Sequence, residues 1–261
     1  MSIHDRFDLV IFDWAGTMVD FGCEAPVKAL IEAFGTEGVR IDAATARRDM
    51  GMAKVDHVRA VLAVPTVAAT WRARHGRPAD EGDVELIMSR LRAPMREHAA
   101  RASTLIPGAR ECIEQLRAQG LRIASSTGYT REMMKPVLVR AAEQGYIPEH
   151  LVCSGETPAG RPSPLMIYKA CVDLGVWPLS RVVKVDDAQA GIAEGRSAGA
   201  FTVGVASGNL LGMSFDAFCA LSPAERESHT GAARAALLRA GADLAIDSVA
   251  DLVPALERIC G

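Results

Sequence analysis

The sequence lacks three features that assign many proteins to a class. It has no excess of basic residues, because 29 Lys and Arg face 32 Asp and Glu, so it offers no basic field for nucleic acid. It has no apolar run near the roughly 20 residues that span a bilayer, and no signal-like N-terminus. Its six cysteines form no Cys-x-x-Cys pair. We therefore expect a cytoplasmic protein with reduced thiols, without structural zinc and without nucleic-acid or membrane partners.

What the sequence does contain is an alternation of short apolar runs and helical patterns. Short runs rich in Val and Leu are typical of parallel strands buried on both faces. The alternation predicts an α/β fold with a doubly wound (Rossmann-like) parallel sheet core, in which ligands bind beyond the carboxyl ends of the strands. The expected strands are residues 8–12, 121–125, 150–153, 182–185, 201–205 and 244–246, and the expected helices between them are 109–119, 131–143, 164–174 and 188–198.

Residues 22–101 interrupt this alternation. They contain almost no strand pattern and divide into candidate helices at 26–34, 44–62, 67–74 and 81–100. We expect an all-helical cap domain, 22–101, inserted into a catalytic core domain made of residues 1–21 and 102–261. Such a cap would cover the sheet edge at which Asp13 follows the first strand.

Polar residues lie at or after the ends of four expected strands. Each has an ordinary explanation when taken alone, because Asp often caps a helix, Arg beside Pro is usually a surface residue, and an Asp pair often belongs to a turn. Together, in this order, they predict a site that binds a phosphoryl group and Mg²⁺. The four sites are Asp13, the segment 126–129 with Thr127 and Gly128, Arg161, and the pair Asp186 and Asp187.

This set resembles the haloacid dehalogenase superfamily of aspartate-dependent phosphotransferases over essentially the whole chain. The resemblance implies that Asp13 is the nucleophile, Thr127 the second-motif hydroxyl, Arg161 the third-motif cation and Asp187 the metal-binding acid. Asp186 stands where many members have Gly, so its support of the metal is left open, with Asp187 expected as the direct ligand. The helical insertion is similar to the first-position cap of that superfamily.

Within the superfamily, the chain resembles the phosphonoacetaldehyde hydrolase (phosphonatase) branch. The motifs that carry this resemblance are FDWAGT at 12–17, MGMAKVDHVR at 50–59, GRPSP at 160–164 and KVDD at 184–187. Met18, Met52 and Ala53 depart from the pattern, but none carries the proposed chemistry. Ala15 is the informative residue, because aspartate-based phosphatases usually have there an acid that protonates the leaving oxygen.

The resemblance implies that the leaving group is carbon, which explains why an acid at position 15 has no task. A bare carbanion is too basic to leave, whereas an imine between an aldehyde and Lys54 lets the carbon leave as an enamine. Asp13 would form an aspartyl phosphate, and the products would be acetaldehyde and phosphate, as part of 2-aminoethylphosphonate degradation. Lys54 must be neutral to react, so we expect burial to depress its pKa.

The remaining roles are also implied by the resemblance. Mg²⁺, or Mn²⁺ with the same oxygen ligands, would be bound by Asp13, Asp187 and the Ala15 carbonyl, and a homodimer would form through the cap. If residues 50–57 are helical, the spacing of Met50, Lys54 and His57 places them on one face, where His57 could move protons through water. The residues expected to bind substrate or to support the site are Ala15, Cys23, Met50, Gly51, His57, Thr127, Gly128, Tyr129 and Arg161.

Two other functions stay open at this point. One is a phosphatase of the same superfamily that acts on a phosphate ester, and Ala15 argues against it because no obvious acid replaces the missing one. The other is a non-catalytic phosphate- or metal-binding module, and the intact set of Asp13, Thr127, Arg161 and Asp187 argues against that.

Overall fold

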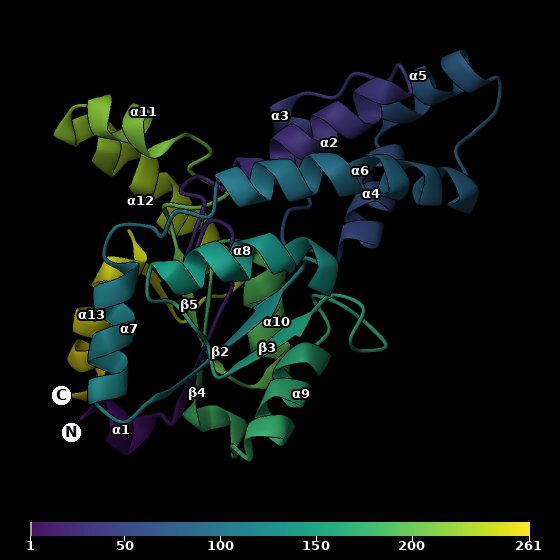
Figure 1. Ribbon diagram of the computed structural model, residues 1–261. Coiled ribbons are helices and arrows are strands. Elements are labelled where there is room, and N and C mark those ends of the chain that lie inside the picture. Colours follow the sequence, from purple (N-terminus) through teal and green to yellow (C-terminus); the bar gives the residue numbers. More distant parts are fainter. Residues whose placement is uncertain (1) are drawn as a thin grey trace.

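The computed structural model describes residues 2–261 and contains one sheet of six parallel strands (Figure 1). The strand order is β3-β2-β1-β4-β5-β6, so β1 lies in the middle, paired with both β2 and β4. The strands are β1 Leu9–Phe12, β2 Arg122–Thr127, β3 His150–Cys153, β4 Val182–Asp186, β5 Phe201–Val205 and β6 Leu244–Ile246. All six expected strands are present, and β2 and β4 extend beyond their expected ends, to Thr127 and Asp186.

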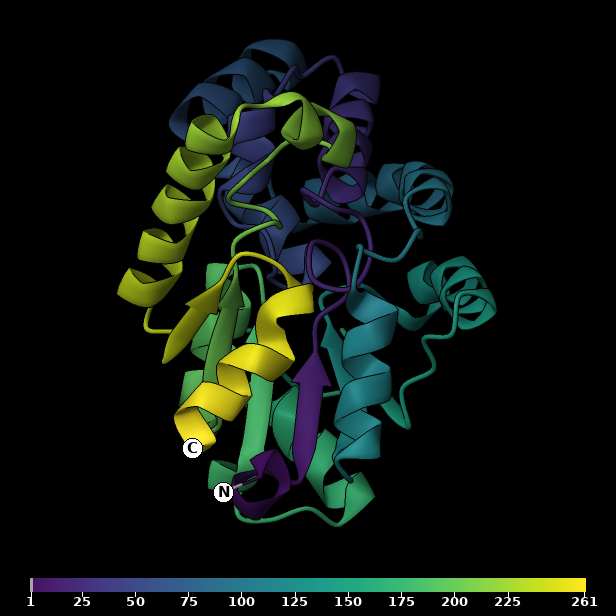
Figure 2. The ribbon, with the colours of Figure 1, turned by 90° about the vertical axis from the view of Figure 1, so that its left-hand side faces the viewer.

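Both faces of the sheet are covered by helices, as expected for a doubly wound fold. Val10 and Phe12 belong to the same buried cluster as residues of α7 (Ala109–Ala118), α8 (Arg131–Glu143) and α13 (Leu252–Cys260). Leu9 and Ile11 point to the other face, into a cluster with residues of α9 (Leu165–Leu174). Figure 2 shows α7 and α13 in front of the sheet. The α/β fold predicted from the alternating pattern is therefore confirmed.

Every regular element between residues 22 and 101 is a helix. These five helices follow β1 and lie beyond the carboxyl ends of the strands, above the sheet in Figure 1. The longest, α6, has Pro94 in its interior and packs along α2. We call α2 to α6 the helical layer; its members are α2 Ala25–Thr36, α3 Ala43–Arg47, α4 Lys54–Leu62, α5 Pro65–His75 and α6 Glu81–Arg101.

One expected helix, 44–62, is interrupted. α3 ends at Arg47 and α4 begins at Lys54, and Gly51 between them adopts a φ of +92°, which an α-helix cannot accommodate. Met50 therefore lies in the turn before α4 and not on the helix face of Lys54 and His57. The sequence pattern also missed two short helices, α1 (Ile3–Arg6) and α11 (Phe215–Ala220).

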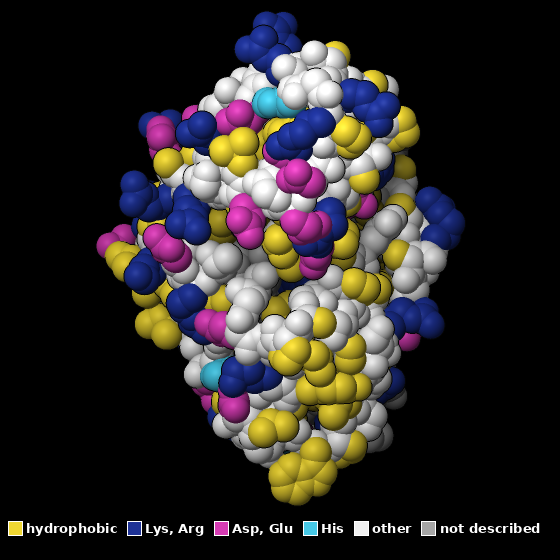
Figure 3. Space-filling model, turned by 90° about the vertical axis from the view of Figure 1, so that its right-hand side faces the viewer, with side chains coloured by type: hydrophobic (Ala, Val, Ile, Leu, Met, Phe, Trp, Pro, Cys, Tyr) yellow, Lys and Arg dark blue, Asp and Glu magenta, His cyan; other side chains and the backbone are white. Residues whose placement is uncertain are grey.

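The remaining elements complete the edge of the sheet and the surface. They are α10 Gln189–Ala198, α12 Pro223–Ala240 and the single turns η1 Leu179–Arg181 and η2 Val249–Asp251. Basic and acidic side chains intermingle on the face shown in Figure 3, as the near balance of charge in the sequence indicates. Among residues 2–261, no helix combines the length and the apolar character that crossing a membrane requires.

Candidate active site

Asp13 is placed by the end of the central strand. β1 ends at Phe12, and the backbone N–H of Asp13 continues the ladder by donating to the Val185 carbonyl at 3.0 Å. The chain then turns through Gly16, whose φ is +89°. A side chain on Gly16 would overlap the carboxylate of Asp187, so glycine at this position lets the turn approach the acid closely.

Three buried carboxylates converge at this edge. Asp13, Asp186 and Asp187 each offer an oxygen within 4.8 Å of the others. Burial, followed by repulsion from Asp186, raises the pKa of Asp13 to about 6. Burial and the charges of Asp13 and Asp186 hold the pKa of Asp187 well above its usual range. These carboxylates repel one another, and a set of oxygen ligands with this much negative charge is suited to a hard divalent cation.

The two neighbouring acids are held in different ways. Both oxygens of Asp186 face protein donors, since Oδ1 accepts from the Ala188 N–H at 3.0 Å and Oδ2 lies 2.9 Å from Lys184 Nζ and 3.3 Å from Arg161 Nη1. Asp187 accepts two neutral hydrogen bonds, from Thr17 Oγ1 at 3.2 Å and from the Asn209 N–H at 2.6 Å. Asp187 is thus free of a protein cation within residues 2–261, which favours it over Asp186 as a metal ligand.

Arg161 lies at the centre of a buried ion network. Its Nη1 is 2.8 Å from Asp13 Oδ1, its Nε is 2.9 Å from Glu194 Oε2, and its Nη2 donates to the carbonyl and hydroxyl of Ser126 at 2.6 and 3.1 Å. Lys184 joins the same network through Glu194 at 3.4 Å. All donor-bearing nitrogens of Arg161 are therefore engaged within the protein, and the guanidinium fixes Asp13 in place.

Sequence reasoning missed the roles of Glu194, Lys184 and Ser126 in this network. Arg161 and Lys184 pair with three buried carboxylates, those of Asp13, Asp186 and Glu194, whereas the buried Asp187 lies outside these ion pairs. A signal for Glu194 exists in the sequence, because its spacing from Gly191 and Ala198 places it on the buried face of α10.

Lys54 is buried in a different environment. It begins α4, its side chain is 2% exposed, and its Nζ lies 3.9 Å from Met50 Sδ and 5.2 Å from the centre of the Tyr129 ring. Among residues 2–261, no carboxylate forms a salt bridge with it. Burial lowers the pKa of Lys54 to about 8, although Cys23 and Asp13 oppose this shift.

His57 follows Lys54 on α4 and is fully buried. Neither ring nitrogen has a hydrogen-bond partner within residues 2–261. Burial, followed by repulsion from Lys54, lowers the pKa of His57 to about 3, so the ring is neutral at physiological pH. With its pKa lowered this far, the imidazole is a weak proton acceptor.

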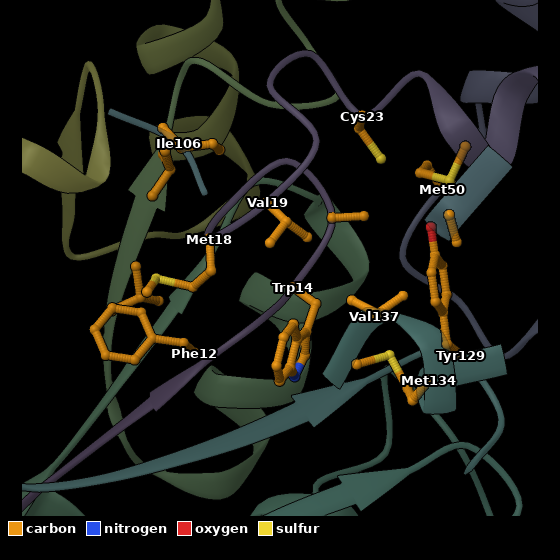
Figure 4. Close-up of a cluster of buried hydrophobic side chains, with 14 of the residues drawn as sticks. Phe12, Trp14, Met18, Val19, Cys23, Met50, Ile106, Tyr129, Met134 and Val137 are labelled. Atoms are coloured by element: carbon orange, nitrogen blue, oxygen red, sulfur yellow. The ribbon is translucent and has the colours of Figure 1, made fainter. Parts of the chain in front are cut away.

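The predicted site residues, apart from His57, line one small cavity of about 20 Å³, which is close to the space of one water molecule. Three of its lining residues, Cys23, Met50 and Tyr129, lie near one another, and the ring of Tyr129 points toward Met50 (Figure 4). A larger cleft of about 750 Å³ lies among α4, α5 and α6, but Arg59 and Glu81 there pair with each other at the surface. The lining residues of the small cavity are Asp13, Ala15, Cys23, Pro26, Met50, Gly51, Lys54, Thr127, Gly128, Tyr129, Arg161, Asp187 and Ala188.

The fold and this acid-rich edge define a hydrolase of the haloacid dehalogenase-like class, whose family model matches residues 7–199. Curated relatives then narrow the class. The chain is 45% identical to "Phosphonoacetaldehyde hydrolase" of Paraburkholderia xenovorans, over 96% of this chain and 94% of that protein. It is 40% identical to a protein of the same name from Bacillus cereus, over 97% of each.

A solved structure agrees with these relatives. The crystal structure of a phosphonoacetaldehyde hydrolase-like protein from Oleispira antarctica superposes with a TM-score of 0.94 at 38% identity, covering 97% of this chain and 93% of that one. The chain therefore belongs to the phosphonoacetaldehyde hydrolase family of the haloacid dehalogenase-like hydrolases. The resemblance seen in the sequence motifs is confirmed.

Proposed function

We propose that this protein hydrolyses the P–C bond of phosphonoacetaldehyde to acetaldehyde and phosphate. One observation carries the proposal beyond the names of the relatives: Lys54, a buried amine without a salt-bridge partner among residues 2–261, shares a small cavity with Asp13, while residue 15 is Ala. This arrangement supplies a nucleophile for phosphorus and an amine for the aldehyde, and it supplies no acid at position 15 for a leaving oxygen.

The first half of the reaction makes carbon a leaving group. The neutral Lys54 amine adds to the aldehyde and, with one proton taken up from solvent, loses water to give a protonated imine. His57, one helical turn from Lys54, does not line the cavity and would act in this proton transfer only through an intervening water. A carboxylate oxygen of Asp13 then attacks phosphorus. The electron pair of the breaking P–C bond moves into the imine, so the carbon leaves as a neutral enamine.

The second half returns the enzyme to its starting state. Protonation of the enamine carbon and hydrolysis of the imine release acetaldehyde and free Lys54. Water cleaves the aspartyl phosphate at Asp13 and releases phosphate. The overall change is the addition of one water molecule across the P–C bond, with no oxidant or reductant required.

The phosphoryl group would be held at the end of β2. Thr127 and Gly128 line the cavity, and a side chain on Gly128 would overlap the Met52 carbonyl, so only glycine lets these segments meet. Arg161 was expected to hold phosphoryl oxygens, and its engaged donors support a second task, which is to aim Asp13. Both tasks put positive charge where the transferred group carries negative charge.

Magnesium is the cation that we propose for this site. The oxygen-only donor set supports Asp13, Asp187 and the Ala15 carbonyl as its ligands, with Mn²⁺ accommodated by the same atoms. When bound, the ion would offset the negative charge of the phosphoryl group. Asp186 would act from outside this set, by holding Arg161 and Lys184.

Substrate entry requires movement of the helical layer. A cavity of about 20 Å³ is too small for a phosphonate, and Asp13 and Lys54, 7% and 2% exposed, come from the sheet and from α4. In this proposal residues 22–101 form a cap domain that opens and closes over a core of residues 1–21 and 102–261, with the resemblance and the helical layer as its support.

Three further expectations belong to the same proposal. Six free cysteines, five of them buried, are compatible with a reducing, cytoplasmic location. An aldehyde substrate of this kind implies an earlier step that converts 2-aminoethylphosphonate to the aldehyde. A homodimer through the cap domain is supported by the resemblance, and light scattering of the purified protein tests it.

A product assay tests the proposed reaction. Incubation with phosphonoacetaldehyde and Mg²⁺ should release acetaldehyde and phosphate in equal amounts, whereas an aryl phosphate ester should release phosphate far more slowly. Preferential turnover of the ester would contradict the proposal and would make the protein a phosphatase. Turnover of neither compound would favour a binding module.

A further inference from the structure

Arg47, at the end of α3, joins three separate segments of the chain. Its Nη1 donates to the Gly22 carbonyl at 2.8 Å and to the Cys23 carbonyl at 3.3 Å, both before α2. The guanidinium also reaches the loop after β5, where Nη1 is 3.4 Å from the Asn209 carbonyl and Nη2 is 3.4 Å from the Gly212 carbonyl. Within residues 2–261 its contacts are to amides, because no carboxylate forms a salt bridge with it.

Asn209 also forms hydrogen bonds with Arg47 through its side chain. Its side-chain Nδ2 donates to the Arg47 carbonyl at 3.3 Å, while its Oδ1 accepts from Arg47 Nη1 at 3.4 Å. Asn209 is 7% exposed, and its backbone N–H is the group that donates to Asp187 Oδ2 at 2.6 Å. One residue of the sheet side therefore contacts both the helical layer and the carboxylate expected to bind metal.

Only one of the Arg47 hydrogen bonds is of ordinary length, and the bond to Cys23, at 3.3 Å, is as long as those that cross to the loop after β5. The bond to Gly22, in the segment that leads into the helical layer, has an ordinary length of 2.8 Å. The bonds across to Asn209 and Gly212 are 3.3–3.4 Å, near the long limit for N–H···O contacts. Long amide contacts without a counter-charge are easily exchanged for water, so this junction can release without unfolding either side.

We propose that Arg47 and Asn209 are positioning residues that hold the active site closed. We call this junction, made of Arg47, Asn209 and Gly212, the Arg47 latch. When the helical layer docks, Arg47 fixes the loop after β5, and the Asn209 N–H is thereby held on Asp187. Closure over Lys54 and orientation of Asp187 are then one event. The inference rests on the proposed opening of the cap domain, and it does not depend on which compound is the substrate.

The chain contains its own reporter of closure. Cys23 lines the active-site cavity and is 2% exposed, whereas Cys219 is exposed on α11. Alkylation of Cys23 relative to Cys219, measured by peptide mass spectrometry without substrate, reports the fraction of time for which the site is open. Arg48 supplies a matched control, because it is an exposed neighbour that pairs only with Asp49 among residues 2–261.

Arg47→Met should raise the Cys23 to Cys219 alkylation ratio about tenfold, and Asn209→Ala should raise it by a similar factor. The double variant should exceed neither single variant by much, because both remove the same junction. Arg48→Met should leave the ratio unchanged. Titration calorimetry with Mg²⁺ should show weaker binding to Arg47→Met, an effect that loss of packing on α3 alone would not produce.

Equal alkylation ratios in wild type and a folded Arg47→Met variant would overturn the latch. If that variant does not fold, as judged by circular dichroism, Arg47→Lys keeps the charge but loses the fork, and it should give an intermediate ratio. A wild-type ratio for Arg47→Lys would overturn the latch in that case. Because the alkylation needs no turnover, an inactive protein with a shifted ratio would refute the proposed reaction and retain the latch.

Discussion

Two buried lysines, one that lines the cavity and one in the ion network around Arg161, differ in almost every contact. Lys184, on β4, has Asp186 Oδ2 at 2.9 Å, Ser126 Oγ at 2.9 Å and Glu194 Oε2 at 3.4 Å. Lys54, on α4, has a thioether, an aromatic ring and a neutral imidazole around it. The charge of Lys184 is held by carboxylates on the sheet side, whereas Lys54 on the helical side has no such partner and loses its proton more readily. The same residue type therefore has two different roles, and the surroundings of each lysine determine which one it has.

The largest expected effect is on catalysis at the helical side. Lys54→Arg keeps the positive charge but cannot form an imine, so turnover of phosphonoacetaldehyde should fall by about 10⁴-fold or more. Lys28→Arg, at an exposed lysine of α2, should behave as wild type in the same phosphate-release assay. Adding Ala15→Asp to Lys54→Arg should not restore activity. Near-normal turnover of Lys54→Arg would leave Ala15 without an explanation.

The next effect is on stability at the sheet side. Lys184→Met should lower the free energy of unfolding by about 3–5 kcal/mol, because it leaves Asp186 and Glu194 buried with less compensation. Urea unfolding of the metal-free protein gives this value directly. A change below about 1 kcal/mol would show that the paired network does little for the fold.

Replacing the buried lysine of the helical side should instead raise the free energy of unfolding. Lys54→Met removes a buried group whose pKa is lowered to about 8, and it should raise the free energy of unfolding by roughly 1–3 kcal/mol at pH 7. Below pH 8 Lys54 is protonated in both the folded and the unfolded wild type, so the full free-energy cost of burying its charge is present there. Between pH 8 and 10.5 the unfolded chain binds more protons, so wild-type stability rises and the advantage of Lys54→Met shrinks. A destabilised Lys54→Met would contradict the comparison.

The smallest expected effect is the pH dependence of the rate. Because the neutral amine reacts, kcat/KM should fall about tenfold for each pH unit below the pKa of Lys54, which is about 8, and level off above it. The profile is measured from pH 6 to 9 with saturating Mg²⁺. A flat profile over this range would mean that deprotonation of Lys54 does not limit formation of the imine.

Sequence reasoning predicted the sheet and the residues after its strands because both follow local rules, whereas cavity members from the helical side, such as Lys54 and Cys23, came from the family resemblance. Short buried strands repeat, and the residues after their carboxyl ends must meet at one edge. It could not place the break between Arg47 and Lys54, because the pattern of the 44–62 segment remains helical and only Gly51 signals the turn. It also could not show that Glu194, ten residues after the strand segment at Lys184, turns back to pair with it and with Arg161.

His57 illustrates a second limit. Its spacing from Lys54 correctly placed both on α4, yet the imidazole is buried behind the cavity and does not line it. Whether a side chain faces a pocket or the layer behind it depends on packing between distant segments, which periodicity does not encode. The Arg47 contacts to Asn209 and Gly212 depend on such packing as well.

Borohydride trapping tests the difference between the two lysines most directly. Reduction of the enzyme in the presence of phosphonoacetaldehyde or acetaldehyde, followed by peptide mass spectrometry, should place a reduced two-carbon adduct on Lys54 and none on Lys184. Phosphate release without an adduct on Lys54, or an adduct on Lys184 in its place, would contradict the account.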